Sequence, residues 1–304
     1  MAPRPFTPAE LLTGPFHRRD AYAAGLTDKQ LRSPCWRRLF ANVHVAASLP
    51  LTDEMRFSAV MLAAPPGAVV TGLTAAWLMG VWSPRPGTVL PLELGIRRED
   101  RNTSGSRVLT KRIVLDAVDV NEWNGVAISS PERTCFSLMA RSSLVEAVVF
   151  ADAFQHADLV TQRGLFRFAD ERPHWPHVRK VRVAVDLSRH ESRSPGETRL
   201  RMVIVLGGLR EPPILNGPVY SENGELLGIL DFLYFAPDFG IEYDGRYHDE
   251  ASQHARDNIR ENKLLAVGGI PLLRYGAHDV FRNPQRIERE VAAMLGGRSL
   301  RRAA

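Results

Sequence analysis

Residues 226–244 read LLGILDFLYFAPDFGIEYD, two apolar runs separated by the turn-forming pair Pro237 and Asp238. The first run, 226–235, is almost wholly apolar apart from one acid, Asp231. The second run alternates apolar residues with small or acidic ones. Runs of this kind on either side of a turn are typical of a β-hairpin. The sequence therefore predicts a hairpin in which one acid lies inside an apolar strand.

The register of this hairpin decides which acids share a face of the sheet. A turn centred on residues 237 and 238 places Asp231 opposite Asp244, and a turn shifted by one residue in both arms places it opposite Glu242. Side chains alternate between the two faces of a strand, so Glu242 and Asp244 lie on the same face. Either register therefore puts all three acids on one face, whereas a loop of odd length would not.

Three neighbouring carboxylates repel one another, and a charge inside an apolar strand is costly unless it is compensated. A divalent cation is one solution, since Mg²⁺ (or Mn²⁺ in its place) is held by one or two carboxylates, with water and phosphate completing its shell. Protonation of one acid, or an ion pair with an arginine such as Arg260, is the other. The hairpin by itself leaves both open.

The segments on both sides of the hairpin predict an α/β sheet. Ser194-Pro195-Gly196-Glu197 opens a helix, with serine as the cap, proline in the first turn and Glu197 placed to close a capping box. A short strand at 218–221 precedes the hairpin, and a helix at 249–267 and a strand at 270–275 follow it. The order helix, strand, strand, strand, helix, strand, helix gives a sheet with one hairpin and one crossover.

The first 50 residues predict a winged helix-turn-helix module. Short helices are expected at 7–12 and 17–24, and the capping box Thr27-Asp28-Lys29-Gln30 starts a third helix. An apolar run at 39–47 supplies a wing. Two helices joined by a glycine turn, the later one basic, favour DNA binding, although any small helical domain shows capped basic helices. The candidate DNA-binding residues on the third helix are Lys29, Arg32, Arg37 and Arg38.

Residues 51–190 predict a mixed α/β domain between the module at 1–50 and a C-terminal domain at 191–304. The expected elements are buried helices at 52–64 and 71–80, strands at 89–97, 107–115 and 118–128, and further helices from 131 to about 169. His174 and His177 have a spacing that a helix could use for a metal, but the prolines beside them disrupt such a helix, so a loop is expected.

The net charge of +5 is unevenly distributed. Residues 1–50 contain 7 Lys and Arg against 3 Asp and Glu, whereas residues 191–295 contain 12 against 16. The basic first segment favours nucleic acid as a partner. Cys35 and Cys135 form no disulfide or zinc pattern, so we expect a cytoplasmic protein. The uncharged stretch 57–84 is divided by a Pro-Pro-Gly sequence, so no membrane span is expected.

The hairpin and the residues after it match a known pattern. The segment Glu242-Tyr243-Asp244-Gly245-Arg246-Tyr247-His248, with Asp231 before it, resembles the very-short-patch repair endonuclease-like family of the PD-(D/E)XK nuclease superfamily. The resemblance covers about the last third of the chain and extends to Asp257, Arg260, Leu264, Gly268 and Arg274. It implies a restriction-endonuclease-like αβββαβ core.

This resemblance implies roles for individual residues. Asp231 and Glu242 would ligate a catalytic Mg²⁺, and Glu197 would be the acid on the first helix of the core. His248 would be a general base or a phosphate contact, and Arg260 a contact to the scissile phosphate. Hydrolysis of a phosphodiester with a metal needs carboxylates to hold the ion, an acidified water and a cation for the developing charge.

One position departs from the motif of the superfamily. Asp244 stands where the motif has a lysine, two residues after the acid, that would position or activate the attacking water. Lys263 on the following predicted helix could reach the site instead. A nuclease fold that binds DNA without cleaving it is the alternative.

The beginning of the chain resembles the N-terminal part of AbiEi-type antitoxins, through residues 17–27 (HRRDAYAAGLT) and 130–134 (SPERT). That resemblance implies DNA binding and a cognate toxin as a partner. The leading hypothesis is a metal-dependent DNA endonuclease in repair or defence, with an N-terminal DNA-binding module. The alternative is a non-catalytic transcriptional regulator of the antitoxin type, and a third hypothesis is an interaction scaffold with a solvated acidic edge.

Overall fold

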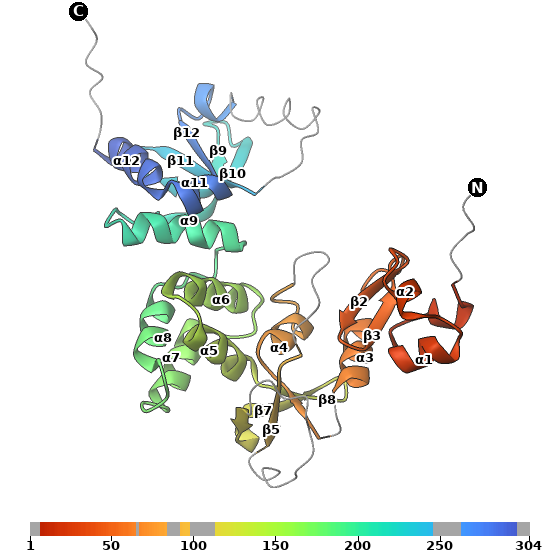
Figure 1. The fold of residues 1–304 in the computed structure, drawn as a ribbon. Helices are drawn as coiled ribbons and strands as arrows, with labels where there is room; N and C mark the ends of the chain where they lie inside the picture. Colours follow the sequence, from red (N-terminus) through yellow and green to blue (C-terminus); the bar gives the residue numbers. More distant parts are fainter. Residues whose placement is uncertain (1–6, 65–66, 84–91, 98–112, 246–262, 297–304) are drawn as a thin grey trace, which may run out of the picture. The chain divides into compact units, whose positions relative to one another are not determined.

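A computed structural model describes residues 7–64, 67–83, 92–97, 113–245 and 263–296 (Figure 1). The chain divides into two compact units, 1–138 and 139–304. Each unit has its own sheets and helices, so the protein is of the mixed α/β class. Among the described residues, no helix is both long and apolar enough to span a membrane.

The first unit begins with a small module of short helices and a three-stranded sheet of order β1-β3-β2. Its elements are η1 (Ala9–Leu11), β1 (Phe16–His17), α1 (Arg18–Ala23), α2 (Asp28–Leu31), β2 (Trp36–Phe40) and β3 (Val43–Ala46). The predicted capping box of Thr27 and Gln30 is present at the start of α2. The hairpin β2–β3 occupies the place predicted for a wing.

The third predicted helix is much shorter than expected. It ends at Leu31, and both Arg37 and Arg38 lie on strand β2. The reason is local, because Pro34 has no amide hydrogen to donate and keeps the residue before it out of helical geometry. Two of the four candidate DNA-binding residues are therefore strand residues, which corrects the prediction.

The rest of the first unit contains a five-stranded sheet of order β6-β5-β4-β8-β7. Its elements are α3 (Asp53–Ala63), β4 (Val69–Val70), α4 (Gly72–Leu78), β5 (Leu94–Arg97), β6 (Ile113–Leu115), η2 (Ala117–Asp119), β7 (Val120–Trp123) and β8 (Val126–Ser129). The single strand predicted at 118–128 is instead a hairpin. Asn124 and Gly125 both have positive φ, at 49° and 74°, and asparagine followed by glycine is the standard signal for a two-residue hairpin turn.

The second unit starts with helices. These are α5 (Pro131–Arg141), whose first residues belong to the first unit, α6 (Leu144–His156), α7 (Gln162–Asp170) and α8 (Val178–Asp186). His174 lies in the loop between α7 and α8, as predicted, and His177 is the cap residue that ends this loop. Helix α8 was not predicted, although its buried residues Val178, Val181 and Val185 follow a helical period.

A four-stranded sheet of order β12-β11-β10-β9 completes the second unit. Its elements are α9 (Pro195–Leu206), β9 (Ile214–Tyr220), β10 (Leu226–Tyr234), β11 (Phe239–Asp244), β12 (Leu272–Gly276), α11 (Ala277–Arg282) and α12 (Pro284–Leu295). Strands β9, β10 and β11 are antiparallel, and β12 is parallel to β11. Residues 263–266 are helical, so the order of the described elements is the predicted one.

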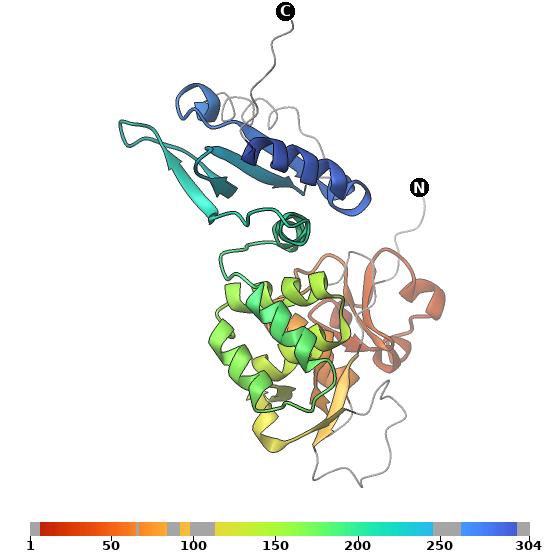
Figure 2. The ribbon, with the colours of Figure 1, turned by 90° about the vertical axis from the view of Figure 1, so that its left-hand side faces the viewer.

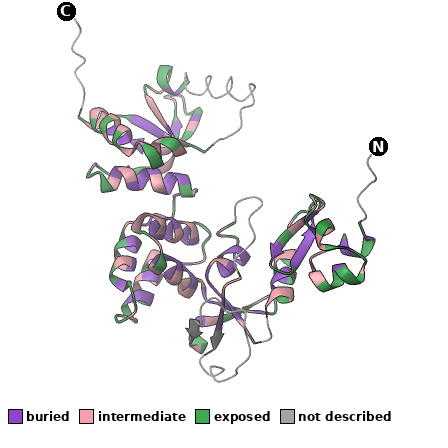
Figure 3. Cartoon of the chain, in the orientation of Figure 1, coloured by how far each residue is buried: buried purple, intermediate pink, exposed green. Residues whose placement is uncertain are grey.

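Helices cover one face of this sheet. Phe232 and Tyr234 of β10 and Ile241 of β11 share a buried core with α9, α11 and α12. The turned view of the ribbon shows helices beside this sheet (Figure 2). The core residues on those helices are Leu200, Ile204, Val280, Ile287 and Val291. A second cluster joins Leu230 and Leu233 to Leu264. The buried positions therefore gather along α9 and the central strands (Figure 3), and these two elements hold the candidate site.

Candidate active site on the C-terminal sheet

The hairpin adopts the second of the two predicted registers. Residues 232, 233 and 234 pair with 241, 240 and 239, so the four-residue turn is 235–238 and the same register places Glu242 opposite Asp231. The regular pairing ends there, and the Tyr243 N–H is donated to Asp231 Oδ2 at 2.7 Å. The half-buried Asp231 carboxylate therefore lies against the backbone amide that follows Glu242.

Glu197 reaches this part of the sheet from the first turn of α9. Ser194 caps the helix as predicted, its Oγ accepting from the Glu197 N–H at 3.1 Å. The predicted return bond from the Glu197 carboxylate to the Ser194 N–H is not among the bonds of these described residues. Glu197 Oε2 instead accepts from the Arg193 N–H and from Asn216 Nδ2, both at 2.9 Å. The side chain is 7% exposed, so sheet and helix together fix its orientation.

Asn216 lies opposite Asp231 in the sheet and forms a hydrogen bond to Glu197. The pairs on either side, 217 with 230 and 215 with 232, place Asn216 opposite Asp231 on the neighbouring strand. Its Nδ2 also donates to the Glu191 carbonyl at 2.8 Å, so one amide group ties β9 to both ends of the turn that leads into α9. Its φ is 50°, a left-handed value that asparagine tolerates better than most residues. The sequence analysis missed this residue, and its only local signal was an asparagine within a strand, where that residue type is depleted.

The first turn of α9 touches β11 directly. A Cβ atom added to Gly196 would lie 2.0 Å from Tyr243 Cε1, so only glycine allows this close approach. Gly196 precedes Glu197, and Tyr243 follows Glu242. The contact therefore brings together the segments that carry Glu197 and Glu242, two of the predicted catalytic acids.

Glu242 is paired with an arginine on the next strand. Arg274 lies beside it in the parallel register of β11 and β12, and its Nε is 3.2 Å from Glu242 Oε2. The Glu242 side chain is 14% exposed and the Arg274 side chain 32%. Arg274 thus compensates one of the acids, as one predicted alternative required, whereas Arg260, the arginine named in that prediction, lies outside the described residues.

The remaining predicted site residues lie at or beyond the end of β11. Asp244 is the exposed last residue of that strand, and His248 and Arg260 lie outside the described residues. Lys263 was considered as a replacement for the motif lysine. Its Nζ lies 3.1 Å from Oε1 of Glu225, which comes just before the start of β10 and six residues before Asp231, so its partner is not one of the site acids.

The donor set suits a hard divalent cation. Asp231 and Glu242 offer carboxylate oxygens, which are the ligands that Mg²⁺ prefers, and one or two protein carboxylates suffice because water and phosphate complete the shell. Within the described ranges, no group of three or more His, Cys, Asp or Glu side chains is close enough together to hold a metal. Asp231 and Glu242 would supply two carboxylate ligands to such an ion.

A buried ion pair anchors α9 to α6 one residue beyond Glu197. Asp152 Oδ2 accepts from Thr198 Oγ1 and from Arg201 Nη2, both at 2.8 Å, and Asp152 Oδ1 accepts from the Arg189 N–H at 2.7 Å. Asp152 is 1% exposed and Arg201 is fully buried. Burial raises the pKa of the Asp152 carboxyl, and the Arg201 guanidinium opposes that rise. These contacts fix the helix that positions Glu197.

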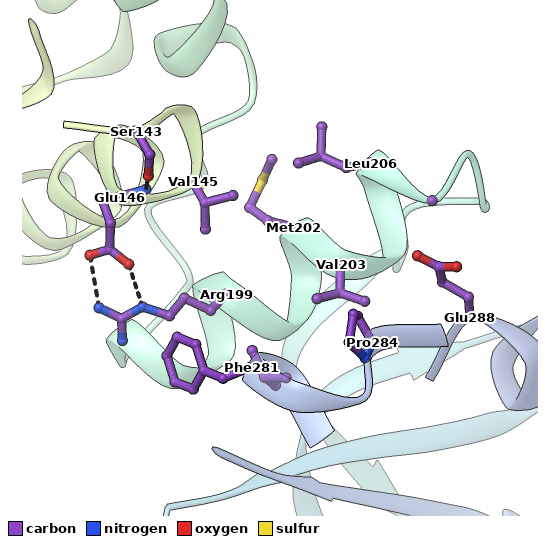
Figure 4. Close-up of a pocket in the computed structure, with 12 residues that line it drawn as sticks. Ser143, Val145, Glu146, Arg199, Met202, Val203, Leu206, Phe281, Pro284 and Glu288 are labelled. Atoms are coloured by element: carbon purple, nitrogen blue, oxygen red, sulfur yellow. Dashed lines mark hydrogen bonds and ion pairs between the residues drawn. The ribbon is translucent and has the colours of Figure 1, made fainter. Parts of the chain in front are cut away.

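A pocket of about 440 Å³ lies elsewhere on α9, between this helix, α6 and the α11–α12 turn (Figure 4). Figure 4 shows the Arg199 guanidinium facing Glu146 across a two-bond ion pair of 2.6 and 2.9 Å, with the Phe281 ring beside it. The bond to Glu146 raises the pKa of Arg199. The described lining includes Met202 and Leu206 but none of the three acids, so this pocket is separate from the candidate site.

The predicted DNA-binding residues of the first unit have different surroundings. Arg37 Nη2 donates to the Leu49 carbonyl at 3.0 Å, so its guanidinium holds the module together. Lys29 is exposed on α2. Arg32 and Arg38 line a common pocket. The structure therefore brings together two of these four residues.

Comparison with known proteins adds no family assignment. No protein-family model matches the chain, and no curated protein matches it. The functional proposal therefore depends on the residues and their geometry.

Proposed function

We propose that this chain is a metal-dependent DNA endonuclease and that Glu197, Asp231 and Glu242 form its active site. The observation that carries the proposal is the hydrogen bond from the Tyr243 N–H to Asp231 Oδ2. This bond holds the Asp231 carboxylate beside the backbone amide that directly follows Glu242. The hydrogen bond from Asn216 to Glu197 links this third acid to the residue of β9 that lies opposite Asp231. Carboxylates that hold a divalent cation are what metal-dependent hydrolysis of a phosphodiester requires.

Each residue has a distinct task in this proposal. Asp231 and Glu242 would hold Mg²⁺, and their backbone and arginine partners fix the orientation of both carboxylates. A bound Mg²⁺ makes a coordinated water more acidic and offsets charge on the phosphate. Arg274, one-third exposed beside Glu242, is placed to offset further negative charge on the DNA. His248 and Arg260 are retained as a proposed general base and a proposed phosphate contact.

A nicking assay on supercoiled plasmid with Mg²⁺ or Mn²⁺ tests the proposal. Parent protein is expected to nick the plasmid, and Asp231→Ala and Glu242→Ala are expected to lose this activity. Glu222→Ala, an exposed acid between β9 and β10, is the matched control and should keep it. Cleavage that survives Asp231→Ala would come from another site or a contaminant and would refute the assignment.

A second candidate function is DNA binding without catalysis, as in a transcriptional regulator. Two observations favour it: Asp244 occupies the position of the motif lysine, and Lys263 is engaged with Glu225. This function predicts salt-dependent DNA binding that Asp231→Ala leaves intact, together with an uncleaved plasmid under every metal and salt condition. The same preparations therefore decide between the two functions.

A further inference from the structure

The first unit contains a polar pocket of about 510 Å³ among α1, α2 and the β2–β3 hairpin. Three arginines line it, one from each of three segments: Arg18 from α1, Arg32 at the end of α2 and Arg38 from β2. His44 of β3 also contributes to the lining. We propose that this pocket is a binding site for a phosphate group.

The charge of the pocket is positive after its internal pairing. Arg18 Nε and Nη2 both donate to Asp28 Oδ1, and these bonds lower the pKa of the Asp28 carboxyl, so this pair is internally neutral. The side chains of Arg32 and Arg38 are exposed, and neither guanidinium group forms a hydrogen bond or ion pair with another described residue. Two unpaired guanidinium groups therefore face the pocket, and the planar guanidinium group matches the geometry of phosphate oxygens.

His44 supplies an independent sign that a ligand belongs here. Its side chain is 5% exposed, its ring stacks on Phe16 at 6.0 Å, and its Nδ1 has no hydrogen-bond partner within the described part of the chain. Buried polar side-chain atoms nearly always have a partner, so an orphaned atom of a residue that lines the pocket indicates a missing group. Burial, and then the positive charge of Arg38 and Arg18, lowers the pKa of His44 to about 4. The imidazole is therefore neutral at pH 7.

The phosphate could come from the DNA backbone or from a free nucleotide, and both present the same chemistry to the pocket. The site is separate from the acids of the second unit, so it would bind phosphate even if those acids cleaved nothing. If DNA is the source, the proposal deepens the DNA-binding part of the proposed function. The expected contact is then with the backbone, which fixes the position of the protein on the duplex without reading its sequence.

Full-length protein in EDTA tests the proposal, because no cleavage occurs without metal. The titration of His44 is followed by NMR of labelled histidine with inorganic phosphate, a deoxynucleoside monophosphate or a short DNA duplex as the probe. A bound phosphate is expected to raise the His44 pKa by about one unit or more, because a nearby anion stabilises the imidazolium form. The phosphate would act in the same direction as Asp28, which raises this pKa, and against Arg38, Arg18 and His17, which lower it.

Charge-matched variants complete the test. Arg38→Gln is expected to weaken duplex binding about tenfold and to reduce the salt slope of the affinity by about one. Arg19→Gln removes the same charge from a side chain that is 79% exposed outside the pocket lining, and should change the affinity little.

The three probes identify the source of the phosphate. A response to the duplex alone assigns the pocket to the DNA backbone, and a response to phosphate and nucleotide but not to duplex assigns it to a free nucleotide. No change at His44 with any probe, or equal effects of Arg38→Gln and Arg19→Gln, overturns the proposal.

Discussion

Replacing Asn216 with aspartate should destabilise the second unit more than any other single-atom change near the candidate site. Asn216 Nδ2 donates to Glu197 Oε2 at 2.9 Å and to the Glu191 carbonyl at 2.8 Å, and aspartate can make neither bond. A hydrogen bond to a charged group contributes about 1.5–3 kcal/mol and a neutral one about 1 kcal/mol. Two carboxylates in contact also repel by about 4 kcal/mol until one takes up a proton. The expected loss at pH 7 is about 3–5 kcal/mol.

Asn216→Gly is the matched control for this change. Glycine accepts the φ of 50° without strain and removes the same two bonds, but it adds no charge. The loss of both bonds is expected to lower the free energy of unfolding by about 2.5–4 kcal/mol at any pH from 5 to 8. In Asn216→Asp, the folded state holds a proton more tightly than the unfolded state does, so its stability must rise as the pH falls. The two variants should therefore converge near pH 5.

Hydrogen exchange during a urea titration measures this effect locally. Peptides that cover residues 195–220 report on α9 and β9, the two elements that Asn216 joins. Asn216 does not hold the Glu197 carboxylate if Asn216→Asp lowers the free energy of unfolding by less than about 0.5 kcal/mol at pH 7. The same conclusion follows if the difference in unfolding free energy between the two variants does not change with pH.

Three further predictions follow from the geometry. Gly196→Ala should lower the thermal midpoint through a loss of about 1–3 kcal/mol, because its Cβ would lie 2.0 Å from Tyr243 Cε1; an unchanged midpoint would contradict the contact. Asp152→Ala and Arg201→Met should each cost about 3–5 kcal/mol in urea unfolding, and the double variant clearly less than their sum, since each single change leaves a buried charge. The pKa of His44 is about 4 in the folded state and 6.5 in the unfolded state, so its contribution to the free energy of unfolding is fully present above pH 6.5. About 3 kcal/mol of this free energy is lost as the pH falls to 4. His44→Phe should remove this pH dependence from the acid-unfolding curve.

Local sequence patterns were sufficient to predict the elements that carry the acids. The boundaries of β11 are those predicted, because alternating apolar residues from Phe239 to Asp244 leave one way to bury Phe239 and Ile241. The start of α9 was predicted from Ser194 and Pro195, whose capping chemistry needs no distant partner. The prediction of a long third helix was wrong for an equally local reason, the proline at position 34.

The groups that orient the acids could not be predicted in the same way. Arg274 meets Glu242 only because β12 lies parallel to β11, a register set by a crossover of nearly thirty residues. Asn216 meets Glu197 only because β9 is the edge strand beside β10. Each contact depends on packing between elements that are distant in sequence, and no spacing rule within one element reveals it.

The hairpin sequence left open how neighbouring acids are compensated inside an apolar sheet, and these partners supply part of that compensation. Asp231 accepts a backbone amide, Glu197 accepts a backbone amide and a side-chain amide, and Glu242 is paired with Arg274. Each of the three acids therefore has at least one hydrogen-bond or ion-pair donor among the described residues. A cation that these carboxylates hold only when DNA supplies the phosphate oxygens is compatible with such an arrangement, which is why metal and DNA belong together in the nicking assay.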